Sequence, residues 1–365
     1  MLKLGAYLLC AVMIAPPLCF GEDQPLQVAG ESPVSVRMAL QWSPQSQFAG
    51  FYLAQARGYY AAAGADVSFL HANARHSSLE WLQQGKAELA TAFLADAMVA
   101  AANADDGSEA HPVLIGQLVR RSNLMLLGWK ELGIARLRDL DGRPVSLWPG
   151  PFSVAVRALL ADRGIEPEVI PQYGTVNLFL HQGAAACTAM EYNEYHRVWQ
   201  AGVDQDRLKV FLLRDFGFGF PEDGLYARAD WLQRHGALVE RLWRATMDGW
   251  EYARAHPERA LDLVLSEAER AQVPTNRPHE RWMLKHLLAS IFLDSSEESL
   301  PPARLSASSY AATAKALIGA ALIDKAPPVA DFCPGCRAGD ERSSLSMESR
   351  PMAIDPPDAP ADETR

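Results

Sequence analysis

The stretch LQWSPQSQFAGFY, Leu40–Tyr52, decides how the rest of the chain is organised. It follows Val34–Leu40, where apolar residues alternate as in a β-strand, and it leads into Phe51–Ala61, a helix-like run that ends near Gly64. In an α/β domain, small ligands bind beyond the carboxyl ends of the strands. The indole of Trp42 offers a stacking face at such a site, and the neighbouring Gln side chains offer directional hydrogen bonds. Position alone is equally compatible with a core role for this Trp.

The composition favours a globular protein that binds a small molecule. The chain has 365 residues, of which 49% are hydrophobic, enough for two lobes that each have a core. Its formal net charge is −10, which argues against nucleic acid as a partner, because nucleic acid requires a basic stripe. The sequence has none of the G-x-x-x-x-G-K-S/T, G-x-G-x-x-G, H-E-x-x-H or G-x-S-x-G motifs.

The N-terminus is typical of a secretory signal peptide. Lys3 precedes an apolar run, Leu4–Phe20, that two prolines interrupt, and small residues stand where a cut before Glu22 requires them. A membrane anchor is less favoured, because the run is short and broken. We therefore assign residues 1–21 to a signal peptide and expect a mature protein that is soluble and periplasmic or secreted.

Strand-like and helix-like runs alternate along the rest of the chain, and this pattern predicts an α/β fold of two lobes with mixed, mostly parallel sheets. We expect residues 34–128 and 225–325 to form the first lobe and residues 129–224 the second. The two lobes would then be joined by a hinge of two crossings, near Gly128 and Gly224. Residues 326–365 are polar and are predicted to be a disordered tail that contains a C-x-x-C.

Polar groups also follow two strands of the predicted second lobe. The turn Gly150–Ser153 opens a helix and would present backbone N–H groups to a ligand, although it also suits an ordinary turn. Tyr192, Asn193 and Glu194 come directly after the strand-like run Cys187–Met190. These residues are therefore candidates for the far side of a cleft.

Three cysteines remain after removal of the signal peptide: Cys187, Cys333 and Cys336. The C-x-x-C pair could form a local disulfide, remain as free thiols, act as a redox dithiol or supply half of a metal site. It lacks the second ligand pair that zinc requires, so we expect no metal site and favour a disulfide or free thiols.

Several motifs together resemble one superfamily: Trp42-x-Pro44 with Ala49-Gly50-Phe51-Tyr52, Gly58-Tyr59-Tyr60, Gly85-Lys86-Ala87-Glu88 and Met190-Glu191-Tyr192-Asn193-Glu194-Tyr195. This superfamily comprises periplasmic solute-binding proteins of ABC importers for pyrimidines, alkanesulfonates and nitrate, together with the fungal thiamine pyrimidine synthase. The resemblance covers residues 34–325, and the thiamine-precursor branch is the most similar. It implies the two-lobed periplasmic-binding-protein fold.

The resemblance also implies a ligand site. Trp42 takes the place of the Trp that stacks on the heterocycle, Gln41 stands where the enzymes have Asn, and Gly150–Ser153 falls on a phosphate-holding loop. The Glu after the second-lobe strand falls on Glu191 or Glu194, and we favour Glu194 together with Asn193. The expected ligand-binding residues are Gln41, Trp42, Gln47, Phe51, Tyr52, Gly150, Ser153, Tyr192, Asn193 and Glu194.

The synthase chemistry is not expected. The Lys that holds pyridoxal phosphate and the His that is consumed correspond to Ala92 and Asp96, which can supply neither an amine nor an imidazole. The iron-binding cysteine motif should fall near Gly219–Asp223, which contains no Cys. Pyridoxal phosphate and iron would be cofactors only under the enzyme hypothesis.

The leading hypothesis is thus a monomeric, non-enzymatic solute-binding protein that captures a thiamine-related pyrimidine precursor for an ABC permease. The synthase is one alternative. A sensory binding protein that signals to a membrane receptor kinase is the other, and the sequence does not separate it from the importer hypothesis.

Overall fold

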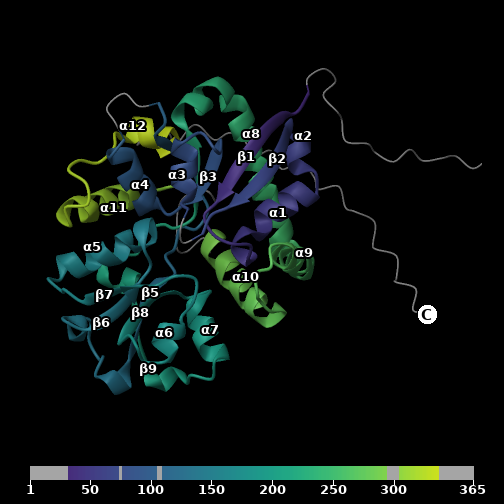
Figure 1. Cartoon of the computed structure of the whole chain (residues 1–365). Coiled ribbons are helices and arrows are strands. Elements are labelled where there is room, and N and C mark those ends of the chain that lie inside the picture. Colours follow the sequence, from purple (N-terminus) through teal and green to yellow (C-terminus); the bar gives the residue numbers. More distant parts are fainter. Residues whose placement is uncertain (1–31, 74–75, 105–108, 294–303, 337–365) are drawn as a thin grey trace, which may run out of the picture.

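The computed structural model describes residues 32–73, 76–104, 109–293 and 304–336, and Figure 1 shows them as two lobes, each built around one sheet. The predicted signal peptide lies outside the described residues. The first lobe contains β1 (Val34–Leu40), α1 (Ala49–Ala56), α2 (Tyr59–Ala62), β2 (Ala65–His71), α3 (Ser78–Gln83), β3 (Leu89–Ala92), α4 (Leu94–Ala102), β4 (Pro112–Gln117) and β10 (Gly224–Arg228). Its C-terminal helices are α8 (Ala229–Ala255), α9 (Pro257–Arg270), α10 (Arg277–Ile291), α11 (Ala307–Gly319) and α12 (Val329–Phe332).

The second lobe is built from residues between β4 and β10. Its elements are β5 (Leu124–Trp129), β6 (Pro144–Leu147), α5 (Val154–Asp162), β7 (Glu168–Pro171), α6 (Asn177–Leu180), β8 (Ala186–Met190), α7 (Glu194–Gln200) and β9 (Leu208–Leu212). The strand orders are β2-β1-β3-β10-β4 and β7-β6-β8-β5-β9. This arrangement confirms the predicted α/β class and the mixed, mostly parallel sheets.

One strand in each sheet runs against the others. β10 pairs antiparallel with β3 and β4, and β5 pairs antiparallel with β8 and β9. Each of these strands directly follows a crossing of the chain between the lobes. Because they run in reverse, β5 and β10 begin at the sheet edge where the parallel strands end. The first residues of both crossing strands therefore lie beside the ligand-binding edge of the sheets.

The position of β5 corrects one expected boundary. Leu124–Trp129 is an internal strand of the second sheet, so the first crossing precedes Leu124, and Gly128 is not a hinge residue. A Cβ on Gly128 would lie 2.4 Å from the Ile134 side chain, so this glycine allows close packing beneath the sheet. The apolar pattern of β5 marks a buried strand but does not say which sheet it joins.

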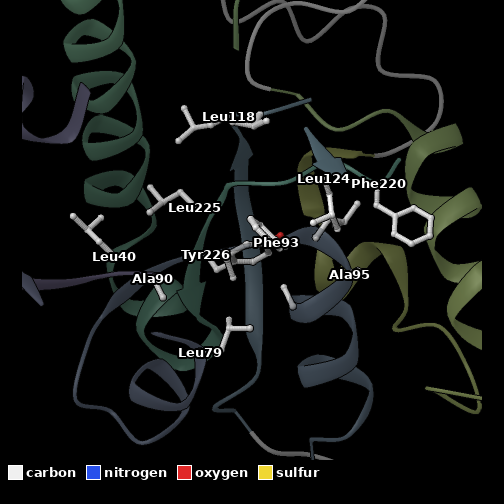
Figure 2. Close-up of a cluster of buried hydrophobic side chains, with 14 of the residues drawn as sticks. Leu40, Leu79, Ala90, Phe93, Ala95, Leu118, Leu124, Phe220, Leu225 and Tyr226 are labelled. Carbon is white, nitrogen blue, oxygen red and sulfur yellow. The ribbon is translucent and has the colours of Figure 1, made fainter. Parts of the chain in front are cut away.

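The hydrophobic core runs through the hinge without interruption. Figure 2 shows Leu118 of the first crossing, Leu124 at the start of β5 and Phe220 of the second crossing in one buried cluster with Phe93 and Tyr226 of the first lobe. These side chains belong to one cluster that extends into the second lobe as Val145, Leu147 and further buried residues. The two lobes therefore share apolar packing at the crossings.

The segment after residue 325 departs from the predicted disordered tail. α12 packs on the first lobe, where the Phe332 ring is buried against Tyr226 and Tyr310. Cys333 is buried and disulfide-bonded, which agrees with the disulfide interpretation, whereas Cys187 in β8 is a buried free thiol. The buried ring, the buried, disulfide-bonded Cys333 and the hydrogen bond from the Tyr310 hydroxyl to the Pro327 carbonyl together attach this segment to the first lobe. Residues 337–365 lie outside the described part.

No helix within the described residues is both long and apolar enough to cross a membrane.

Helix α1, which follows the Trp42 stretch, lies directly on α8 (Figure 1). A Cβ on Gly249 of α8 would lie 2.0 Å from the Gly50 carbonyl oxygen and 2.9 Å from the Ala54 nitrogen. Both atoms are backbone and cannot move aside as a side chain would. Gly249 therefore sets how closely the two helices approach.

We expect Gly249→Ala to lower the free energy of unfolding by about 1–3 kcal/mol, the usual cost of forcing extra volume into a packed contact. Chemical denaturation measures this change. Gly236→Ala in the same helix is the matched control, because nothing lies within 4 Å of its would-be Cβ. If the two variants had equal stability, the close approach of α1 and α8 would not constrain the fold.

Candidate ligand-binding site

A hollow of about 380 Å³, part of it open to solvent, lies between the two lobes. Both lobes line it. The first lobe contributes Gln41, Trp42, Gln45, Gln47 and Phe93, and the second contributes Trp148, Phe152, Met190, Tyr192, Asn193 and Glu194.

These residues share one topological position. Gln41 follows β1, Phe93 follows β3 and Trp148 follows β6, while Met190 is the last residue of β8. The carboxyl ends of the parallel strands of both sheets therefore face the same hollow, as the general rule for α/β folds expects.

Four aromatic rings form one side of the hollow, and Phe152 is at their centre. Its ring makes T-shaped contacts with three other rings. The centroid distances are 5.5 Å to Trp42, 5.7 Å to Phe93 and 6.4 Å to Trp148. Phe152 comes from the second lobe, whereas Trp42 and Phe93 come from the first. The aromatic wall therefore spans the cleft, and it offers rings on which a flat ligand can stack.

Amide side chains from the first lobe form a second side. The Gln41 and Gln47 amides both donate to the Asp223 carboxylate, at 2.6 and 2.8 Å, and Gln45 donates to the Gln47 side-chain oxygen at 2.6 Å. Because a carboxylate only accepts, these bonds fix which way both amides point. They leave the Gln41 Oε1 atom buried, with no hydrogen-bond partner in the described structure.

The second lobe supplies a carboxylate. The Glu194 oxygens accept from the Met190 backbone N–H at 2.9 Å and from the Asn193 amide at 3.1 Å. Burial raises the pKa of Glu194. Each oxygen has made one hydrogen bond and can accept another, so Glu194 can receive an N–H from a ligand.

Asn193 is held from the other lobe. Its Oδ1 accepts from Arg197 at 2.9 Å and lies 3.1 Å from the Nε2 atom of His279 in α10, whose Nδ1 is 2.9 Å from that of His196 in α7. Burial lowers the pKa of His279 to about 3, so this imidazole is neutral at physiological pH. A neutral histidine pair therefore connects α7 of the second lobe to α10 of the first lobe.

Trp42 is positioned through its backbone. The His71 Nδ1–H donates to the Trp42 carbonyl at 2.7 Å, because a carbonyl can only accept. The His71 Nε2 atom then accepts from the Tyr52 hydroxyl at 3.2 Å. Burial lowers the pKa of His71, consistent with this neutral tautomer. Tyr52 thus helps to position the Trp42 backbone through His71.

Of the ten expected site residues, the structure brings six to the hollow: Gln41, Trp42, Gln47, Tyr192, Asn193 and Glu194. Phe51 and Tyr52 lie elsewhere, because α1 directs their rings into the first-lobe core against Trp250 and Phe69.

The turn at Gly150–Ser153 contributes differently from the expectation. Gly150 is exposed, and the Ser153 hydroxyl is buried in a local bond to the Gly150 carbonyl at 3.0 Å. The turn reaches the hollow through the Phe152 ring instead. The residues that sequence reasoning missed are Gln45, Phe93, Trp148, Phe152 and Met190. A search for aromatic residues immediately after strands would have found Phe93 and Trp148.

The second crossing carries two adjacent buried carboxylates. Glu222 accepts from the Asn123 and Leu124 backbone N–H groups and from the Ser122 hydroxyl, at 2.6–3.0 Å. It therefore ties the two crossings together, while Asp223 holds the amide side of the hollow. Burial raises the pKa of Glu222 to about 8 and that of Asp223 to about 6.

Two five-stranded sheets with a lined hollow between them define the periplasmic-binding-protein fold. The alkanesulfonate-binding protein SsuA from Xanthomonas axonopodis pv. citri, bound to MOPS, has this fold with a TM-score of 0.58 at 16% identity, over 83% of this chain and 99% of that one.

The chain belongs to the NMT1/THI5-like family, whose profile matches residues 45–260. It is 26% identical over 249 residues to the riboflavin-binding protein RibY of Chloroflexus aurantiacus, covering 65% of this chain and 68% of that protein. It is 23% identical over 263 residues to the formylaminopyrimidine-binding protein of Halalkalibacterium halodurans, covering 70% of this chain and 77% of that protein.

The Glu222 carboxyl predicts a specific pH dependence of stability. Its pKa is higher in the folded protein than in the unfolded chain, so its contribution is complete below the unfolded pKa and is lost as pH rises through about 8. Between pH 7 and 9 we expect this loss to lower the free energy of unfolding by about 1–1.5 kcal/mol. Glu222→Gln, which carries no titrating proton, should remove that fall.

Urea denaturation at several pH values measures the effect. The window lies above the ordinary histidine pKa, so His71 and His279 contribute little to the slope. Glu168→Gln, at an exposed position of β7, is the matched control and should keep the wild-type slope. A Glu222→Gln variant with an unchanged slope would contradict the assignment.

Proposed function

We propose that this protein captures a flat nitrogen heterocycle, in particular a thiamine-related pyrimidine precursor, and delivers it to an ABC importer. The observation that carries the proposal is the composition of the hollow: aromatic rings on one side, amides and one carboxylate on the other. Among the described residues that line it there is no Lys or Arg. A sulfonate or nitrate site would use such cations, whereas ring N–H and amino groups match acceptors.

The acceptors are placed for such a ligand. Gln41 Oε1 is buried and unpaired in the described structure, and Glu194 retains free acceptor positions. A buried acceptor without a partner costs about 1–3 kcal/mol, so a ligand that donates to Gln41 recovers this cost.

We propose binding without catalysis. At the end of β3 the position that would hold pyridoxal phosphate is Ala92, a methyl group that cannot form an imine. Within the described residues no group of three or more His, Cys, Asp or Glu side chains is placed to hold a metal ion. The residues present therefore do not fit pyridoxal phosphate or iron, and we derive no step through either.

The importer role and a periplasmic or secreted location complete the proposal. They are supported by the family membership, by the two relatives named as binding proteins of small heterocyclic molecules, and by the signal-like residues 1–21.

Calorimetry and thermal-shift measurements with a ligand panel test the proposal. The panel contains thiamine, 4-amino-5-hydroxymethyl-2-methylpyrimidine, formylaminopyrimidine, riboflavin, an alkanesulfonate and nitrate. We expect a pyrimidine to bind most tightly and to raise the melting temperature. Tighter binding of riboflavin would keep the heterocycle site but reject the pyrimidine. Binding of the alkanesulfonate alone would reject both.

Two substitutions locate the site. Trp42→Ala should weaken binding of the best ligand at least about tenfold, because it removes a stacking face worth about 0.5–1.5 kcal/mol beyond the burial of its area. Glu194→Gln should weaken binding by a similar factor, because it replaces one acceptor oxygen with a donor. Tyr173→Ala is the control, since Tyr173 is 62% exposed and outside the hollow. Full affinity in both site variants would place the ligand elsewhere.

A further inference from the structure

A second, smaller cavity lies behind the aromatic wall. Phe93 and Phe152 line both cavities, so their rings form a shared partition. Behind it stand two more rings, Phe218 and Phe220, and the carboxyl groups of Asp96 and Glu222. Apolar rings around acidic groups are an arrangement that suits a cation or an amino group.

Asp96 is the unusual member of this set. The residue is only 5% exposed, yet it accepts no hydrogen bond and forms no ion pair with any residue that the structure describes. Glu222, by contrast, has hydrogen bonds to the first crossing. A buried carboxyl group without a partner is costly and rare in native proteins.

The position of Asp96 in its helix does not explain why its carboxyl group is buried without a hydrogen-bond partner. Asp96 lies in the first turn of α4, where acidic residues often cap the free N–H groups. The N-cap of α4, Phe93, makes no side-chain cap bond, no hydrogen bond joins Asp96 to the described part of the helix, and Asp96 lines the cavity. The nearby titratable groups are also acidic: Glu222 lines the same cavity, and Tyr226 is close enough to feel the charges of Asp96 and Asp223.

We propose that this cavity is a second subsite of the cleft, which receives an amino group on a short arm of the ligand and binds it through Asp96. The inference rests on the proposed function, because the ring of the ligand would occupy the main hollow. The arm would pass the edges of Phe93 and Phe152. Phe152 is only partly buried, and its ring lines both the hollow and the cavity behind it.

The subsite couples binding to a proton. Burial raises the pKa of Asp96 well above its ordinary value, which favours the protonated carboxyl group over the carboxylate in the empty site. When an ammonium group enters, either the carboxyl proton or one ammonium proton must leave for solvent, and the pair remains joined by a hydrogen bond. Both routes release about one proton for each ligand bound.

Isothermal titration calorimetry of the full mature chain tests the subsite. The probes are two pairs of 4-amino-2-methylpyrimidines that differ only at carbon 5: aminomethyl against hydroxymethyl, and 2-aminoethyl against 2-hydroxyethyl. We expect at least one amino compound to bind wild-type protein more tightly than its hydroxyl partner. Titrations in phosphate and in Tris, which differ in ionisation enthalpy, should show release of about one proton for the amino compound alone.

Asp96→Asn keeps the shape of the side chain and removes its titrating group. We expect it to weaken the preferred amino compound roughly 10- to 100-fold, to leave its hydroxyl partner unchanged and to abolish the proton release. Asp66→Asn, at an exposed position of β2, is the matched control and should preserve both measurements.

The outcomes separate the subsite from the proposed function. If no pyrimidine binds wild-type protein, the proposed function fails and the subsite with it. If the pyrimidines bind but Asp96→Asn weakens amino and hydroxyl compounds equally, or changes neither pair, Asp96 has a structural role and the subsite is rejected. A thermal melt of each variant confirms that the comparison is made on folded protein.

Discussion

The site and the hinge depend on two adjacent carboxyl groups that point in opposite directions. Glu222 binds Ser122 and Asn123 of the first crossing and Leu124 at the start of β5, while Asp223 binds Gln41 and Gln47 of the first lobe. Residues 222 and 223 immediately precede β10, so one short segment carries both carboxyl groups to the point where the chain re-enters the first sheet. One backbone segment therefore fixes both the spacing of the crossings and the direction of the amides that line the hollow.

Each lobe supplies different walls of the hollow, so ligand binding depends on how closely the two lobes approach each other. The amides come from the first lobe and the carboxylate of Glu194 from the second, while Phe152 brings the aromatic wall across from the second lobe to Trp42. A ligand that contacts all three walls must contact both lobes. Its binding energy would then favour the arrangement in which the lobes approach each other, which is how hinge proteins close on a ligand.

The sequence predicted the two lobes because strand and helix periodicity is local, and it found the Trp42 stretch and Tyr192–Glu194 because both follow strands. It placed β5 in the first lobe, since a buried strand has the same pattern in either sheet. It also misjudged residues 326–336, where the buried Phe332 ring and the buried, disulfide-bonded Cys333 attach the segment to the fold. Phe51 and Tyr52 were taken for ligand contacts because they adjoin Trp42, although the turn of α1 directs them inward.

By itself, the sequence determined the α/β class, the order of the elements and the kinds of side chain at the strand ends, because these follow from hydrophobic period and turn chemistry. The tertiary structure alone decided which of those side chains meet. Phe93, Trp148 and Phe152 become one wall only when two sheets are set edge to edge, and Asp96 lines a cavity only because Glu222 and Phe220 return beside it from more than a hundred residues away. Contacts over such separations depend on how the sheets pack, which local patterns do not encode.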